Sequence, residues 1–252
     1  KVRPPRMGDA SSTPGGALGR IRVVECAEMV AGPFCGRLLA GFGAGVLKGE
    51  SLAGDAARRR GPFVGEGPDR ERSALFLYLN VNKRGLCLNL GTPTGRAILY
   101  QILATADVLI EDFPPDRAAV LGVDYADLGA AFPRLVVASI TPFGQTGPYR
   151  AYRAYDLNVF HGGGEGFLLP NGLAWELFPD RAPLKPGGQM ADYHAGLTAA
   201  VGILAALHER LDSGRGQHVD CSKQEAQLSL IYLAFQRYVD GRVESRANRA
   251  FR

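Results

Sequence analysis

Few side chains in this sequence have the type and spacing of a known catalytic or metal-binding motif. None of the 4 histidines shows metal-ligand spacing, and the 4 cysteines contain no C-x-x-C pair. The patterns G-x-x-x-x-G-K-S/T, G-x-S-x-G and G-x-G-x-x-G are also absent from the sequence. The sequence therefore predicts no metal site, no disulfide framework, no P-loop and no serine nucleophile elbow. Reduced thiols of this kind are typical of a cytoplasmic protein.

The remaining candidate residues lie in loops next to short apolar runs. Met29–Pro33 contains Gly32, which would let the backbone approach a ligand at the start of a helix. Asn82–Arg84 precedes the third apolar run, Glu111–Phe113 ends the fourth, and Thr141–Tyr149 follows the fifth. Ligands of open α/β sheets gather at the carboxyl ends of the strands. Each loop taken singly is an ordinary turn rich in polar residues, glycine or proline.

Asp192 stands at the start of an apolar helical pattern. A carboxylate in this position commonly serves as an N-cap, and the helix dipole stabilises it as an anion. A carboxylate can also attack an activated carbonyl and form a covalent intermediate. The residue by itself favours the cap.

The elements that must position these residues alternate along the chain. Six short apolar runs are expected to be buried strands: Ile21–Glu25, Gly45–Lys48, Leu86–Leu90, Val108–Glu111, Arg134–Ile140 and His218–Cys221. Helical patterns cover Pro33–Gly41, Thr94–Ala106, Asp192–Leu211 and Lys223–Val239. This alternation predicts an α/β fold with a Rossmann-like, open, mostly parallel sheet, right-handed crossovers and flanking helices.

The chain divides into one main domain, expected at residues 19–240, and two flanking segments. Residues 1–18 are rich in proline, glycine and basic residues and are expected to form a flexible lead-in. Residues 241–252 form a polar connector. Inside the domain, residues 157–189 contain a run of glycines and clustered prolines, which predicts a long, irregular excursion.

Composition and charge exclude several classes of protein. Of the 252 residues, 46% are hydrophobic and 21% are charged, as in soluble globular proteins. No stretch of about 18 apolar residues occurs, so no membrane span is expected. The net charge of +4 comes without a basic stripe, which argues against nucleic acid as a partner. A mildly positive chain suits a phosphorylated small ligand.

An ordered series of short stretches gives the sequence its clearest resemblance. The stretches are Ile21–Glu25, Val30–Pro33, Gly43–Lys48, Leu79–Arg84, Ala106–Phe113, Pro133–Val136, Phe143–Tyr149, Tyr155–Leu157, Ala191–Leu197 and Gly214–Asp220. In this order they resemble the N-terminal part of the family III CoA-transferases, the group that includes formyl-CoA transferase and carnitine CoA-transferase. The related α-methylacyl-CoA racemases share the fold.

The resemblance implies a reaction and assigns Asp192 to it. In the family this carboxylate attacks an acyl-CoA thioester and leaves an aspartyl anhydride. CoA then returns to form an aspartyl thioester, which passes CoA to an acceptor carboxylic acid. With the motif considered, the catalytic role of Asp192 outweighs the N-cap.

The resemblance also implies binding residues. The substrate contacts would be Val30, Ala31, Gly32, Gln145 and Tyr155. The contacts to CoA, which acts as a substrate, would be Lys48, Asn82, Lys83, Arg84, Asp112, Phe113 and Arg153. No metal is implied.

Several positions depart from the family pattern. Ser51 and Val120 stand where relatives carry phosphate-binding basic residues. Losing one charge-assisted contact weakens binding by about 1.5–3 kcal/mol. Basic residues elsewhere are candidates for compensation: Arg58, Arg59, Arg60 and Arg117. Val30 replaces a glutamine near the oxalate site, which makes oxalate a doubtful substrate.

Two other functions stay open. The first is an acyl-CoA racemase or isomerase, although Tyr155 stands where racemases carry a histidine. The second is a degenerate, non-catalytic CoA-binding module of a longer protein. Family chains continue through a smaller domain and return to the first, and their dimers are interlocked. Residues 241–252 are therefore expected to lead to that smaller domain, and a homodimer or a fused second module is the expected assembly.

Overall fold

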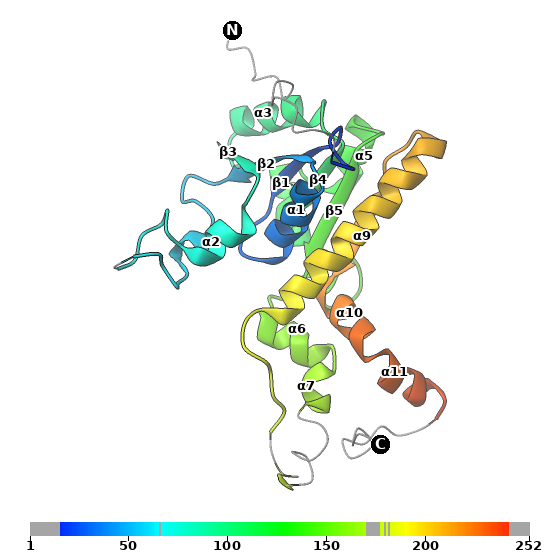
Figure 1. The fold of residues 1–252 in the computed structure, drawn as a ribbon. Coiled ribbons are helices and arrows are strands. Elements are labelled where there is room, and N and C mark those ends of the chain that lie inside the picture. Colours follow the sequence, from blue (N-terminus) through cyan, green and yellow to red (C-terminus); the bar gives the residue numbers. More distant parts are fainter. Residues whose placement is uncertain (1–15, 66, 170–176, 179, 181, 242–252) are drawn as a thin grey trace.

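The computed structural model describes residues 16–65, 67–169, 177, 178, 180 and 182–241. Its centre is a sheet of parallel strands in the order β3-β2-β1-β4-β5-β6 (Figure 1). The strands are β1 (Arg22–Cys26), β2 (Gly45–Glu50), β3 (Lys83–Cys87), β4 (Val108–Glu111), β5 (Val136–Thr141) and β6 (His218–Ser222). The predicted α/β fold with an open parallel sheet is confirmed.

The central strands are buried on both faces. Every residue of β4 and β5 is buried, as expected of parallel strands that helices cover on each side. The edge strand β3 is more exposed and begins at Lys83, three residues before the expected start at Leu86. Its first residue pairs with Val46 of β2. The apolar pattern missed this start because the strand opens with polar residues.

Two layers of helices cover the sheet. One hydrophobic core joins a face of the sheet to α1 (Ala31–Gly41) and α9 (Met190–Ser213). The core on the other face holds α3 (Pro93–Leu103), α4 (Pro115–Leu121) and α5 (Tyr125–Ala131). The strand order reverses between β1 and β4, so the chain leaves these two neighbours toward opposite faces. Such a switch point opens a crevice at the carboxyl ends of the strands.

Helix α9 is the longest element of the described chain. By length and composition it could cross a membrane, with 50% of its apolar window buried. Figure 1 shows it running diagonally along α1 and the sheet and continuing past their lower edge. It packs on α1, β5 and β6, and it carries the buried polar residues Asp192 and Arg210. These contacts are those of a core helix in a folded domain.

Several shorter helices differ from the expectation. The expected helix Lys223–Val239 is divided into α10 (Lys223–Leu228), η2 (Ser229–Ile231) and α11 (Tyr232–Val239). The expected irregular excursion opens with two helices, α6 (Asp156–Gly162) and α7 (Glu165–Leu168). The loop between β2 and β3 holds η1 (Ala56–Arg59) and α2 (Ala74–Leu79), which the sequence pattern did not indicate. Elements of three to eight residues are too short to show a helical period.

The end of the expected lead-in belongs to the folded domain. The Leu18 amide donates a hydrogen bond of 3.0 Å to the Phe42 carbonyl, and the Leu18 side chain packs against the core. Residues 1–15 and 242–252 lie outside the described residues, as does part of the excursion at 157–189.

Candidate active site

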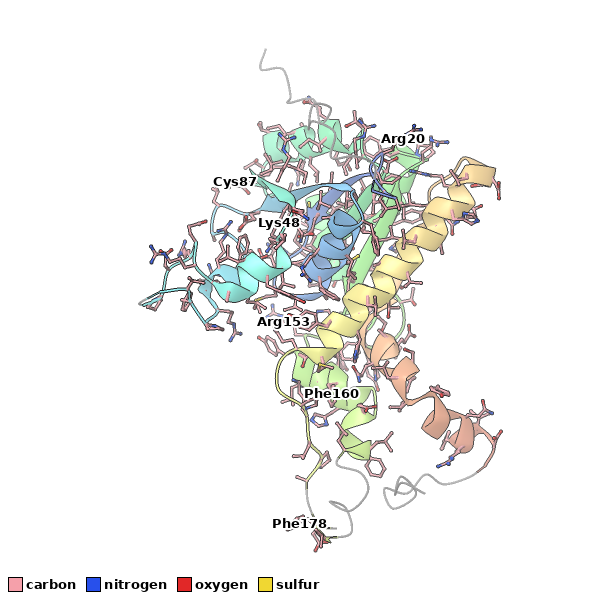
Figure 2. All side chains as sticks on the ribbon, in the orientation of Figure 1. Arg20, Lys48, Cys87, Arg153, Phe160 and Phe178 are labelled. Carbon is pink, nitrogen blue, oxygen red and sulfur yellow. The ribbon has the colours of Figure 1, made fainter. Side chains whose placement is uncertain are left out.

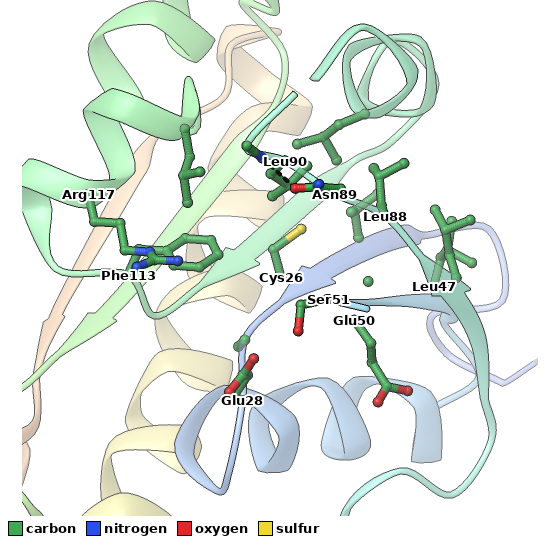
Figure 3. A pocket seen from close by; sticks show the side chains of 17 residues that line it. Cys26, Glu28, Leu47, Glu50, Ser51, Leu88, Asn89, Leu90, Phe113 and Arg117 are labelled. Carbon is green, nitrogen blue, oxygen red and sulfur yellow. Dashed lines mark hydrogen bonds between the residues drawn. The ribbon is translucent and has the colours of Figure 1, made fainter. Parts of the chain in front are cut away.

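A cavity of about 190 Å³ opens at the carboxyl ends of the first three strands. It lies between the sheet, α3 and α4, and its floor is apolar (Figure 3). Its walls include Leu47 of β2, Leu86 of β3, Leu99 of α3 and Phe113 after β4. The volume is below the 300–1,000 Å³ range of whole ligand pockets. The cavity therefore fits one ring system and not a ligand as large as CoA.

The side chains at this cavity include one unengaged cation. Among the described residues, the exposed Arg117 guanidinium has no partner, and the residue lines the cavity. Arg58 is held instead by Glu50 at 2.7 Å and by Glu71 at 2.8 Å, and it stacks on Phe76. Two of the basic residues that the sequence suggested as compensation thus differ. Arg117 lies at the cavity, whereas Arg58 is paired with carboxylates of the protein.

The switch point between β1 and β4 joins the cavity to a second group of charges. The Glu28 amide, just after β1, donates a hydrogen bond of 2.9 Å to Asp112 Oδ2, just after β4. Burial raises the pKa of Asp112 to about 7, while the positive charges of Lys223 and Lys48 act against the rise. Glu28 lines the cavity, and burial together with Asp55 raises its pKa. Polar groups thus continue from the cavity across the edge of the sheet.

Asp192 lies in the first turn of α9 and is 6% exposed. The Lys223 ammonium binds its Oδ1 atom at 2.7 Å. No residue in the described part of the chain hydrogen-bonds to its Oδ2 atom. The Asp192 amide donates a hydrogen bond of 3.2 Å to Asp156 Oδ1, and Lys185 pairs with Asp156 at 2.7 Å. Oδ1 of Asp192 is therefore held by Lys223, whereas Oδ2 is free to contact a ligand.

Local sequence explains this placement. Ser222 ends β6 and caps α10, because its hydroxyl accepts a hydrogen bond from the Glu225 amide. Lys223, the first residue of α10, is thereby fixed at the carboxyl edge of the sheet. Gly196 allows α9 to approach α1, because a Cβ there would lie 2.5 Å from the Ala31 carbonyl oxygen. Asp192 is not the N-cap of α9, the alternative that the residue alone favours, because Gln189 occupies that position.

Two expected CoA contacts, Lys48 and Lys83, are buried inside the protein. Lys48 pairs with Glu25 at 3.0 Å and with Asp55 at 2.9 Å, and Lys83 pairs with Glu25 at 2.7 Å. Both lysine side chains are 2% exposed. Burial alone would lower the pKa of Lys48, but the two carboxylates raise it. These ammonium groups are engaged within the fold, so the structure does not present them to a ligand (Figure 2 labels Lys48).

The lysine network has a structural task at the loop after β1. Asp55 Oδ1 accepts hydrogen bonds from the Met29 amide at 2.9 Å and the Ala57 amide at 2.8 Å. Met29 has a φ of 63°, in the left-handed region. The network therefore fixes the loop that leads into α1.

The expected substrate contacts Val30, Ala31 and Gly32 are buried as well. A Cβ on Gly32 would overlap with the Cβ of Ala27. The glycine is therefore required by packing within the protein, and the expected close approach to a ligand does not explain it. A ligand contact through the backbone of this loop stays a prediction.

Two other expected CoA contacts lie away from the cavity. Asn82 and Arg84 are exposed at the amino end of β3. The cavity is lined instead by residues at and just after the carboxyl end of this strand: Leu86, Leu88, Asn89, Leu90 and Gly91. The structure thus does not bring Asn82 and Arg84 together with Phe113. Sequence reasoning missed Leu88 and Asn89, although the rule of carboxyl strand ends could have found them.

The remaining expected residues lie at or beyond the carboxyl edge. The Gln145 amide donates to both carboxylate oxygens of Asp220, and Gln145 Nε2 is buried without a partner among the described residues. Tyr155, the N-cap of α6, is 83% exposed. Arg153 is exposed and lies outside the sheet, toward the lower end of α9 in Figure 2. Their roles in binding stay predictions.

No group of three or more potential metal ligands gathers within residues 16–65, 67–169 and 182–241 or the short described pieces between them. Sequence reasoning also missed Lys223, Asp156 and Lys185, because lone charged residues far apart in the sequence carry no spacing signal.

Comparison with known proteins identifies the group to which this architecture corresponds. The family model described as "CoA-transferase family III" matches residues 18–251. The succinate–glutarate CoA-transferase of Agrobacterium fabrum is 39% identical over 217 residues, which are 85% of this chain and 52% of that protein. The formyl-CoA:oxalate CoA-transferase of Streptomyces avermitilis is 37% identical over 85% of this chain and 49% of that protein.

A solved structure agrees with these matches. The crystal structure of a CAIB/BAIF family protein from Brucella suis superimposes with a TM-score of 0.83 at 35% identity. The match covers 93% of this chain and 60% of that one. The chain thus spans about half the length of the curated relatives it matches.

Proposed function

The chain belongs to CoA-transferase family III, and from this premise we propose that it carries the nucleophile and part of the CoA site of an enzyme that moves CoA from an acyl-CoA thioester to a carboxylic acid. The observation that supports the proposal best is the state of Asp192. Its carboxylate is held by Lys223 through one oxygen and has the other without a partner among the described residues. A carboxylate fixed in this way suits nucleophilic attack on an activated carbonyl.

The proposed reaction divides one exchange into steps at Asp192. The Oδ2 atom attacks the thioester carbonyl, the C–S bond breaks, and CoA thiolate leaves with the electron pair. Thiolate then attacks the aspartyl carbonyl of the anhydride, which releases the donor carboxylate and forms an aspartyl thioester. The acceptor carboxylate attacks the aspartyl thioester, its C–S bond breaks, and a second anhydride forms as CoA thiolate leaves. The thiolate then attacks the acceptor's acyl carbonyl in this anhydride and expels the Asp192 carboxylate. Asp192 is regenerated as a carboxylate, and no proton is exchanged.

The position of the cavity agrees with this use of CoA. The cavity beside Phe113 has the size of one ring system, and Arg117 offers a cation at its wall. We propose that it takes the nucleotide end of CoA. Glu28 lines the cavity and its amide binds Asp112, whose pKa is influenced by the charge of Lys223, the partner of Asp192. Polar groups thus connect the cavity with the surroundings of Asp192.

A second candidate function is a CoA-binding module without catalysis. It is favoured by the two positions where the family resemblance implies a phosphate-binding basic residue. Ser51 brings only a hydroxyl to the cavity, and Val120 is an apolar side chain that is 73% exposed. The racemase alternative lacks a comparable observation. The His194 Nδ1 atom lies 3.0 Å from Gln227 Oε1, and among the described residues His194 makes no hydrogen bond to Asp192.

The proposed assembly is a homodimer in the cytoplasm. Its support is a row of exposed apolar side chains on α9, with Leu197 at 51%, Val201 at 61% and Leu211 at 79% exposure. An apolar row of this kind commonly marks a protein interface. We take a second copy of the chain as its occupant.

Intact-protein mass spectrometry tests the catalytic proposal. The chain is incubated with a panel of acyl-CoA thioesters and then treated with hydroxylamine or borohydride. We expect an adduct at Asp192, none in Asp192→Asn, and an unchanged adduct in Asp212→Asn, which removes an exposed carboxylate from the far end of α9. Calorimetry should show nearly equal CoA affinity for all three proteins. CoA binding without an adduct in the unaltered chain would favour the non-catalytic module.

A further inference from the structure

Lys223 is the cation whose surroundings change most during the proposed reaction. Its ammonium lies 2.7 Å from Asp192 Oδ1, and the two side chains are 19% and 9% exposed. Asp192 is the one carboxylate in ion-pair contact with Lys223 in the described part of the chain. Lys223 is the first residue of α10, directly after the cap at Ser222, which anchors the start of this helix to the end of β6.

Acylation removes the charge of Asp192 and leaves that of Lys223. An anhydride or a thioester of the aspartyl group is neutral, so the Lys223 ammonium then lacks its paired carboxylate. An ammonium that is largely out of water and has lost its counter-ion is strongly disfavoured. The site therefore gains an affinity for an anion in each acylated state and loses it when the carboxylate returns.

Lys185 makes the contrast clear. It pairs with Asp156 at 2.7 Å, and Asp156 binds the amide of Asp192 without entering the reaction. The Asp156 carboxylate is not acylated in any proposed step, so its ion pair with Lys185 is kept. Of these two lysines, only Lys223 loses its ion-pair partner in the proposed reaction.

We propose that Lys223 is a catalytic residue whose ammonium neutralises the anion that faces acylated Asp192. That anion is the CoA thiolate when the C–S bond of the donor breaks and the acceptor carboxylate when it approaches the aspartyl thioester. The electron pair of the broken bond stays on sulfur, and Lys223 transfers no proton. This inference rests on the proposed function and adds to it the residue that favours carboxylic acids as acceptors.

Single-turnover mass spectrometry on the full chain tests this role. The rate of Asp192 acylation by an acyl-CoA and the rate of its discharge by a carboxylic acid are measured for the unaltered chain, Lys223→Gln, Lys223→Arg and Arg215→Gln. Arg215 is exposed beside the opposite end of β6, so its loss changes the net charge equally at a distance. Thermal unfolding confirms that each variant is folded.

Lys223→Gln is expected to slow acylation and discharge by about 10- to 100-fold each, as for the loss of one charge-assisted contact. Lys223→Arg should recover most of both rates, and Arg215→Gln should match the unaltered chain. A folded Lys223→Gln with unchanged rates would overturn the inference and leave the proposed function standing. A similar loss in the arginine variant would assign Lys223 a packing role. If the unaltered chain forms no adduct, the proposed function fails first.

Discussion

At the scale of single residues, charged groups divide into those that the fold uses and those that it leaves for a ligand. Lys48, Lys83 and Arg58 are paired with carboxylates of the protein, whereas Arg117 has no partner among the described residues. The resemblance marked Lys48 and Lys83 by residue type, but sequence alone does not show which carboxylate a lysine faces. Asp192 could be proposed as the nucleophile from the sequence, because the motif that marks it consists of neighbouring residues, Ala191–Leu197.

Arg117 gives a prediction for the nucleotide end of CoA. Arg117→Ala should weaken CoA binding about 10-fold or more, because one charge-assisted contact is lost. Pantetheine lacks the nucleotide, so its affinity should stay the same. Calorimetry with both ligands measures the difference. Arg84→Ala is the matched control, and a loss of CoA affinity there instead would place the nucleotide at the amino end of β3.

Glu111 gives a prediction for the pH dependence of stability. Burial raises its pKa from 4.5 to about 8, although the Ser139 and Phe113 hydrogen bonds favour the ionised form. The native state therefore keeps a proton that the unfolded state releases between these pH values. The resulting stabilisation is complete below about pH 4.5 and is lost as the pH rises through 8.

The contribution of Glu111 is separated by Glu111→Gln. Between pH 5 and 8 the free energy of unfolding should fall less steeply in this variant, by at most about 1.4 kcal/mol per pH unit. Urea unfolding at several pH values measures the two slopes. Equal slopes would show that Glu111 ionises normally in the native state.

At the scale of elements, the sequence predicted the strands better than the short helices. The strand runs are apolar because the sheet is covered on both faces, so composition alone revealed them. Helices α4 and α5 have seven residues each, and a pattern of two turns is hard to distinguish from a loop. Site residues that follow strand ends, such as Phe113, could be predicted from the sequence. Ion pairs between distant elements, such as Asp192 with Lys223, could not.

The buried ion network links β1, β2, β3 and the start of α1, which leads to a stability prediction. Lys48→Met leaves Glu25 and Asp55 with less compensation and should lower the free energy of unfolding by about 3–5 kcal/mol. Gly36→Ala should cost about 1–3 kcal/mol, because its Cβ would overlap with Glu25 Oε2. Chemical denaturation measures both. Arg84→Ala, on the exposed edge strand, should change stability by less than about 0.5 kcal/mol.

At the scale of the whole molecule, the cavity lies on one face of the sheet, and Asp192, the proposed nucleophile, lies on a helix of the other face. Both are at the carboxyl edge of the sheet. The β1–β4 switch point makes this possible, because the chain turns to opposite faces there. The sequence order of strands and helices predicted the sheet. The surfaces left uncovered on α9 could be seen only in the structure.

The apolar row on α9 gives a prediction for assembly. Replacing Leu197 and Val201 with glutamate should shift the chain from dimer toward monomer, because charges would be placed in a desolvated interface. Light scattering coupled to size-exclusion chromatography measures the mass. Glutamate at exposed Leu52, far from α9 in sequence, is the control. A monomeric unaltered chain would contradict the proposed dimer.

Helix α9 is clamped at both ends. Near its start Asp192 is tied to Lys223, and near its end Arg210 binds Asp107 at 2.9 Å and the Arg134 carbonyl oxygen at 2.9 Å. The two clamps lie about 27 Å apart along the axis at 1.5 Å per residue. A rigid rod held at two points transmits a displacement from one to the other. We therefore expect the position of Asp192, the proposed nucleophile, to depend partly on the contacts of Arg210 at the far end of the helix.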